Sequence, residues 1–281
     1  MVVDLHTHLG EYPGHIGEDF AAEAREAWGG DLRLGRTRDE HYEETRSADR
    51  VVALAFNAPA AGFVVPNDYV AEYVARDPER LIGFGAVDPR DPGAPEELER
   101  MKQDLGLRGC KLGPIYQGVD PLGPEFLRVC ETLERLELPM LVHQGTTFYR
   151  RGPLLHARPI LLDEIALRFP GLTIVIAHMG HPWVEEAVVV VRKNRNVYAD
   201  VSALHPRPWQ LYQALLCALE YRTEHKLLFG SDYPFFTAED TIAGLRAVNG
   251  VVEGTGLPRI PDATVEEIVH RPTLELLGLA D

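Results

Sequence analysis

Short apolar runs alternate with amphipathic segments along most of this 281-residue chain. Runs rich in Val, Ile and Leu predict eight strands. They cover residues 2–8, 50–57, 81–88, 107–113, 139–145, 172–180, 197–202 and 226–232. Most of these runs are apolar throughout, which indicates a sheet that is covered on both faces and is therefore built from parallel strands.

The segments between these runs carry the signals of helices. Residues 94–106 (APEELERMKQDLG) begin with Pro and acidic residues and end at Gly106, the usual order of helix start and stop signals. Similar patterns predict helices within 66–80, 123–138, 157–171 and 181–194. Eight such repeats predict an α/β fold of the (β/α)8 TIM-barrel type. An open doubly wound sheet is the alternative, but it usually has fewer strands, and no Gly-rich dinucleotide motif follows the first strand.

Two stretches depart from this simple alternation. Residues 9–49 form a connection that is too long for a plain barrel loop, and we expect it to cap the mouth of the barrel with a helix at 19–28. The tail from residue 234 is expected to carry one or two final helices. Their apolar stripe consists of Val265, Ile268, Val269, Leu274 and Leu277. Because no linker or change of composition interrupts the chain, we expect residues 1–281 to form one domain.

Composition narrows the classes of partner. The formal net charge of -15 argues against binding to nucleic acid or to an anionic membrane surface. No signal peptide is recognisable, and no apolar run is long enough to span a bilayer. Cys110, Cys130 and Cys217 lie too far apart for a thiolate metal site and are odd in number, which favours buried thiols in a reducing cytoplasm. We therefore expect a cytoplasmic protein that acts on a small molecule.

Polar residues gather at the C-terminal ends of the predicted strands. His6 and His8 share one face of the first strand, because side chains alternate with a period of two. His143, His178 and Asp232 stand at the ends of later strands. In a barrel all these ends open onto one mouth, where active sites are built. Four histidines and one carboxylate are a donor set that suits Zn²⁺ and related divalent ions in a catalytic site.

Asp4 lies on the same face of the first strand as the two histidines, but deeper in the strand. We expect it to support neighbouring groups through hydrogen bonds rather than to bind metal directly. Lys111 stands near the end of the fourth strand and opens onto the same mouth.

Five sequence motifs in a fixed order carry a family resemblance. They are DLHTH (4–8), RGCKLGP (108–114), LVHQG (141–145), IAHMG (176–180) and LFGSDYP (228–234). In these motifs the chain resembles the amidohydrolase superfamily, specifically the amidohydrolase-2 branch, which includes aminocarboxymuconate-semialdehyde decarboxylase. The motifs span nearly the whole chain.

The resemblance implies roles for the residues at the mouth. His6, His8, His143 and Asp232 would hold one divalent metal ion, usually Zn²⁺, and His178 would lie beside the metal-bound water. A bound divalent cation lowers the pKa of such a water toward neutrality. Asp232 would also carry a proton between this water and the leaving group. A homodimer is a further expectation from the family.

Other residues near the mouth are candidates for substrate binding. Lys111 occupies the place where binuclear members of the superfamily carry a carboxylated lysine, but one metal is commoner in this branch, so we favour the unmodified ammonium. It would bind a substrate carboxylate or form a structural ion pair. Arg150 is a candidate clamp for an anionic group, and Trp183 a candidate wall of the pocket. The other candidate wall residues are Tyr116, Phe148 and Tyr149.

Two reactions fit the predicted site. We favour metal-dependent hydrolysis of a small ester, lactone or amide, because the chain is compact apart from residues 9–49. The alternative is metal-dependent, non-oxidative decarboxylation of a small unsaturated or aromatic carboxylic acid, for which the same metal and acid–base pair would serve. A metal-binding barrel without catalytic activity is a third hypothesis, and the complete ligand set argues against it.

Overall fold

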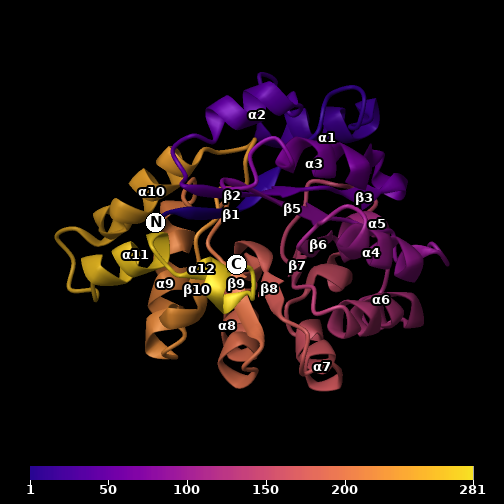
Figure 1. The fold of residues 1–281 in the computed structure, drawn as a ribbon. Coiled ribbons are helices and arrows are strands. Elements are labelled where there is room, and N and C mark those ends of the chain that lie inside the picture. Colours follow the sequence, from indigo (N-terminus) through magenta and orange to yellow (C-terminus); the bar gives the residue numbers. More distant parts are fainter. Residues whose placement is uncertain (281) are drawn as a thin grey trace.

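Eight parallel strands form the centre of the computed structural model, which describes residues 1–280 (Figure 1). Neighbouring strands pair in the order in which they follow one another along the chain. The strands are β1 (Val3–His8), β2 (Arg50–Leu54), β5 (Leu81–Gly85), β6 (Gly109–Leu112), β7 (Met140–Val142), β8 (Ile174–Ile176), β9 (Val197–Asp200) and β10 (Leu227–Leu228). The predicted α/β barrel is confirmed.

The barrel closes between β1 and the segment that follows β10. The amide of Leu5 donates to the carbonyl of Phe229 at 3.1 Å, and the amide of Asp232 donates to the carbonyl of His6 at 2.9 Å. Beyond β10 the chain therefore still follows β1, although it no longer forms a regular ladder. This arrangement places Asp232 beside the histidines of β1.

Helices surround the barrel (Figure 1). Those that follow the strands are α3 (Asn67–Val74), α4 (Ala94–Gln103), α5 (Pro114–Gln117), α6 (Pro124–Arg135), α7 (Leu161–Arg168), α8 (Val184–Lys193), α9 (Pro208–Glu220) and α10 (Ala238–Arg246). In α6 the buried residues include Phe126, Val129, Cys130 and Leu133, a helical spacing that forms one apolar stripe. The helices predicted within 66–80, 94–106, 123–138, 157–171 and 181–194 are all present.

The long connection after β1 folds over the barrel mouth, as expected. It contains α1 (Glu18–Trp28) and also α2 (Arg38–Glu44), which was not predicted. A capping box begins α2, because Thr37 accepts from the amide of Glu40 while the Glu40 side chain accepts from the amide of Thr37. A small hairpin of β3 (Asn57–Ala58) and β4 (Phe63–Val64) lies beside this connection.

The C-terminal helices close the opposite end of the barrel. After α11 (Asp262–Val269), the short helix α12 (Thr273–Leu276) places Leu274 and Leu277 in the apolar cluster that fills the barrel interior. Figure 1 shows α12 near the centre of the ring of strands. The apolar stripe predicted for the C-terminal tail is thus divided between two clusters. Its residues on α11, Val265, Ile268 and Val269, pack in the larger core cluster rather than inside the barrel. Within residues 1–280 the helices are all too short or too polar to cross a lipid bilayer.

Candidate active site

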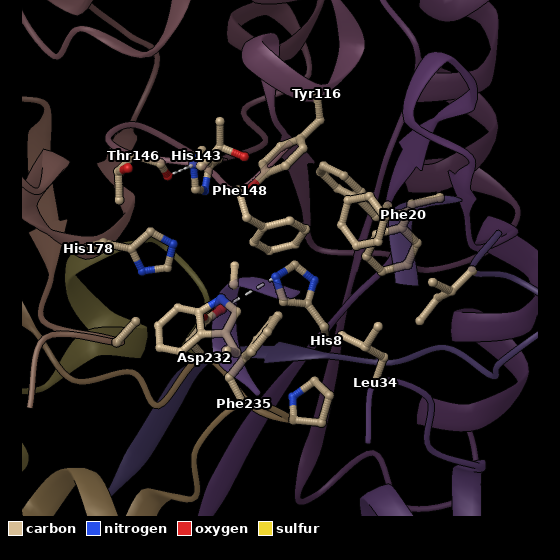
Figure 2. Close-up of a pocket in the computed structure, with 18 of the residues that line it drawn as sticks. His8, Phe20, Leu34, Tyr116, His143, Thr146, Phe148, His178, Asp232 and Phe235 are labelled. Atoms are coloured by element: carbon tan, nitrogen blue, oxygen red, sulfur yellow. Dashed lines mark hydrogen bonds and ion pairs between the residues drawn. The ribbon is translucent and has the colours of Figure 1, made fainter. Parts of the chain in front are cut away.

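The strand ends bring four histidines and one aspartate together. His6 and His8 lie on β1, and His143 directly follows β7. His178 lies in the 3₁₀ turn Ala177–Gly180 after β8, and Asp232 follows β10. We call these five residues the histidine–aspartate cluster. Figure 2 shows the side chains of His8, His143, His178 and Asp232 around a common space.

His6 is held in one orientation by the end of β9. Its Nδ1 lies 2.9 Å from Oδ2 of Asp200, and both side chains are fully buried. An ionised carboxylate can only accept, so Nδ1 carries the proton and Nε2 keeps its lone pair. That Nε2 lies 3.3 Å from Nε2 of His8 and 3.4 Å from Oδ1 of Asp232. The same Asp232 oxygen is 3.6 Å from Nε2 of His8.

His178 is oriented by the same carboxylate. Asp200 accepts from the backbone amide of His178 at 2.9 Å and also from the hydroxyl of Ser202. Because that hydroxyl proton is used, Ser202 Oγ accepts from Nδ1 of His178 at 2.7 Å, which leaves Nε2 of His178 with the lone pair. These bonds hold His178 at a φ of 56°, in the left-handed region that non-glycine residues rarely adopt.

The cluster has the donor chemistry of a divalent metal site. His6, His178 and Asp232 each offer a ligand atom, and these atoms lie within 4.8 Å of one another. Lone pairs and a carboxylate oxygen that converge in this way repel one another unless a proton or cation lies between them. In addition, the buried Nδ1 of His8 has no hydrogen-bond partner among residues 1–280. The residues present therefore fit a divalent ion bound through nitrogen and oxygen.

Three of the four expected metal ligands converge in the structure, and the fourth, His143, makes a different contact. His6, His8 and Asp232 converge as described, whereas Nε2 of His143 lies 3.2 Å from the carbonyl of Thr146 and donates to it. His178, which we expected beside the metal, offers a ligand atom itself.

Burial keeps the cluster histidines neutral. Together with the positive charge of Lys111, it lowers the pKa of His6, His8 and His178 well below 6.5 and that of His143 to about 3. Neutral imidazole is the form that binds metal.

Lys111 and Asp232 are charged groups that line the cavity at the cluster. Lys111 is buried, and its Nζ lies 3.0 Å from Nε2 of His6, whose lone pair accepts from it. Burial lowers the pKa of Lys111 to about 8, and the negative charges of Asp200 and Asp232 oppose this shift. Burial raises the pKa of Asp232 to about 7, against the charge of Lys111. Both groups can therefore change protonation state near neutral pH.

A cavity of about 360 Å³ opens above the cluster. Its lining includes His8, Lys111, His143, His178 and Asp232. Seven of its other lining residues are aromatic, and Figure 2 shows several of these rings turned toward the same space. They belong to Phe20, Trp28, Phe56, Phe63, Tyr116, Phe148 and Phe235. Residues 9–34 contribute Leu9, Ile16, Phe20, Trp28 and Leu34, so the insertion builds part of the cavity.

Some of the candidate substrate-binding residues lie elsewhere. Lys111, Tyr116 and Phe148 line the cavity, but Arg150, Trp183 and Tyr149 are not among its lining residues. Arg150 is mostly exposed, and its guanidinium pairs with Glu26 of α1. The guanidinium of Arg158 covers the ring of Trp183 at 5.2 Å.

Other residues of the site were not assigned from the sequence. Asp200 and Ser202 orient the histidines, and Arg207 and His181 line the cavity. The cluster was identified by selecting polar residues at the C-terminal ends of predicted strands. Asp200 meets the same criterion and could have been found in this way. Arg207 lies beyond that strand and has no comparable signal.

A sequence model of the amidohydrolase family matches residues 3–279. The chain belongs to this family. The amidohydrolase-2 resemblance is therefore confirmed. The chain is also 26% identical over 288 residues to gamma-resorcylate decarboxylase of Rhodococcus jostii, covering 82% of this chain and 84% of that enzyme.

Solved structures share the fold of this chain. An uncharacterised TIM-barrel protein of Bordetella bronchiseptica superimposes with a TM-score of 0.73 at 21% identity, over 99% of this chain and 98% of the other. A dihydroxybenzoic acid decarboxylase of Polaromonas was solved with manganese and the inhibitor 2-nitroresorcinol. It superimposes with a TM-score of 0.63 at 18% identity, over 99% of this chain and 97% of the other.

Proposed function

We propose that this amidohydrolase-family protein is a metal-dependent decarboxylase, which removes CO₂ without net oxidation from a small aromatic carboxylic acid. The observation that carries the proposal is a cavity with unlike walls: aromatic rings on several sides, and the histidine–aspartate cluster with Lys111 at the strand ends. The similarity to gamma-resorcylate decarboxylase supports this reaction over the hydrolysis that we favoured from the sequence.

The aromatic walls would bind the ring of the substrate. Phe20, Phe148 and Tyr116 lie close together, with ring centroids 5.1 Å apart for Phe20 and Phe148 and 6.0 Å apart for Phe20 and Tyr116. Such rings accept a flat aromatic ligand in stacked or edge-to-face contacts. The ring would then be fixed with its carboxylate toward the cluster.

The cluster would bind the carboxylate. The Lys111 ammonium, already directed at Nε2 of His6, can pair with a substrate oxygen. His6, His178 and Asp232, with His8 beside them, would hold the divalent ion. When bound, that ion supplies positive charge that stabilises an anionic substrate oxygen.

Asp232 would move the proton. Loss of CO₂ breaks the bond between the ring carbon and the carboxylate carbon, and the electron pair of that bond takes up a proton on the ring carbon. Asp232, whose Oδ1 lies 3.4 Å from Nε2 of His6 and 3.6 Å from Nε2 of His8, is the carboxylate of the cluster that would take up a proton and deliver it to the ring carbon. His178, whose Nδ1 is fixed by Ser202, would direct the lone pair of its Nε2 at the divalent ion beside the reacting carboxylate.

We propose one divalent ion per chain. We expected zinc from the family resemblance, whereas the Polaromonas decarboxylase was solved with manganese. A donor set of imidazole nitrogen and carboxylate oxygen accepts either ion. Metal analysis of protein purified without chelator would distinguish them, and a preparation with no divalent metal would contradict the proposal.

The reaction is tested by following two products at once. Hydroxybenzoic acids, aromatic esters and lactones would be supplied to the metal-loaded protein, with CO₂ release and acid release recorded for each. We expect CO₂ and the matching phenol in equal amounts, and no turnover after chelation. Acid release from an ester or lactone without CO₂ would instead identify a hydrolase.

A further inference from the structure

Arg207 lies at the cavity, apart from the histidine–aspartate cluster. It lines the cavity together with Ala203 and Leu204 of the loop between β9 and α9. Its Nη1 donates to the carbonyl of Ala203 at 3.1 Å, and its guanidinium carbon lies 4.9 Å from the centre of the Trp28 ring. A loop of the barrel and the helix of the insertion thus hold this guanidinium from two sides.

Arg207 has no acidic partner. Among residues 1–280, no Asp or Glu forms an ion pair with it, whereas Arg150 and Arg158 pair with Glu26 and Glu186. Arg207 is half-buried, and its desolvation lowers its pKa below the usual value. A partly desolvated cation without a counter-ion is costly, and an anion in the cavity would lower that cost.

Arg207 and Lys111 serve different parts of the cavity. Of the described lining residues, these two alone carry a lysine or arginine charge. The charge of Lys111 acts on all four cluster histidines, whereas that of Arg207 acts on His181, whose pKa burial lowers to about 4. Two positive charges therefore face one cavity, and each acts on different histidines.

We propose that Arg207 binds a second carboxylate of the substrate, so that the preferred substrate is an aromatic dicarboxylic acid. The inference rests on the proposed function, in which the first carboxylate lies at the cluster. The guanidinium offers N–H donors beyond the one used by Ala203, in a planar array that matches a carboxylate. Arg207 also directly precedes α9, whose N-terminal dipole adds positive potential there.

Binding measurements test the inference without requiring turnover. Benzoate, isophthalate and terephthalate would be titrated calorimetrically into the metal-loaded wild type and Arg207→Met. We expect one of the dicarboxylates to bind at least about tenfold tighter than benzoate to the wild type, from the strength of charged hydrogen bonds. In Arg207→Met we expect its affinity to fall about 10- to 100-fold and that of benzoate to change less than about threefold.

Two further variants separate charge from structure. Arg192→Met removes an exposed arginine that lies over the Tyr221 ring at 5.3 Å, away from the cavity, and should leave both affinities unchanged. Arg207→Lys keeps the charge without the planar array and should restore part of the dicarboxylate preference. It also provides a charged variant if Arg207→Met is poorly folded.

The outcomes distinguish this inference from the proposed function. Equal binding of mono- and dicarboxylates by the wild type, or equal weakening of both in Arg207→Met, would overturn the inference, even where CO₂ is released from monoacids. An Arg207-dependent preference for a dicarboxylate supports the inference. If that preference occurs without CO₂ release from any acid, the decarboxylase proposal fails while the assigned anion site stands.

Discussion

Asp200 holds His6 and His178 at the same time. One of its oxygens accepts from Nδ1 of His6 and the other from the backbone amide of His178, both at 2.9 Å. It therefore fixes the tautomer of one histidine and the turn that carries the other. Carboxylates in this position orient metal-binding imidazoles and increase their basicity.

Replacing Asp200 with Asn should weaken metal binding. An amide can present its NH₂ group to Nδ1 of His6, which favours the tautomer with the proton on Nε2 and removes the lone pair from the cluster. We expect affinity for Mn²⁺ and Zn²⁺ to fall about 10- to 100-fold. Competition with a chromogenic chelator would measure this change.

Asp163→Asn is the matched control for this substitution. Asp163 lies on α7 and pairs with Lys193 at 2.6 Å, and neither residue lines the cavity. Its replacement should leave metal affinity unchanged. Equal metal affinity of Asp200→Asn and wild type would show that Asp200 does not orient a ligand.

Replacing Asp232 with Asn should abolish turnover while the protein stays folded. The amide cannot deliver a proton, so we expect CO₂ release to fall by at least about 100-fold, the usual contribution of a general acid. Circular dichroism and metal content would be compared with the wild type. Near-normal turnover would remove the proton-transfer role from Asp232.

The strands were well predicted from the sequence, but most of their C-terminal ends were placed too late, although the first strand ends at His8 as predicted. The predicted first residue of each strand differs from the observed one by at most two positions. The largest differences are at β6, predicted from residue 107 and observed from Gly109, and at β8, predicted from residue 172 and observed from Ile174. The predicted final strand continues to residue 232, whereas β10 ends at Leu228. Phe229 and Ser231 stay buried after the ladder ends, and a hydrophobicity pattern reports burial rather than hydrogen bonding.

The convergence of the cluster could be predicted because it follows from topology alone. Every parallel strand of a barrel points its end at one mouth, so position along the strand was sufficient for His6 or His143. The cavity walls depend instead on how loops pack. Trp28 and Arg207 meet across about 180 residues, and no local pattern marks that contact. Arg150, expected at the pocket, pairs instead with Glu26 of α1 and is not among the lining residues, a contact that also depends on loop packing.

Replacing Asp4 with Ala should destabilise the barrel without removing a metal ligand. Asp4 accepts from the amide and hydroxyl of Ser231 at 2.9 and 2.6 Å and from the amide of His6 at 3.2 Å. These bonds join β1 to the segment after β10. Asp4 thus makes the supporting hydrogen bonds that we expected from the sequence. Leaving buried donors unsatisfied should lower the free energy of unfolding by about 2–4 kcal/mol. Denaturant unfolding would measure it; lost metal at unchanged stability would indicate ligation instead.

The buried His41 should make the stability of the protein depend on pH. Its Nδ1 lies 2.8 Å from the Tyr73 hydroxyl and its Nε2 3.0 Å from the Thr7 hydroxyl, which itself donates to a backbone carbonyl. Burial, with the charge of Arg80 adding to it, lowers the pKa of His41 from 6.5 to about 3.

Because the unfolded chain binds this proton more readily, the contribution of His41 to stability is complete above about pH 6.5 and is lost as the pH falls toward 3. Its slope reaches at most about 1.4 kcal/mol per pH unit. His41→Gln removes the titrating group while keeping a donor and an acceptor, so its free energy of unfolding should decline less steeply on acidification than that of the wild type. Urea unfolding of both proteins, kept metal-free with chelator, would measure how the free energy of unfolding changes with pH. Identical slopes for the two proteins would contradict the prediction, because His41 would then have the same proton affinity in the folded and unfolded chains.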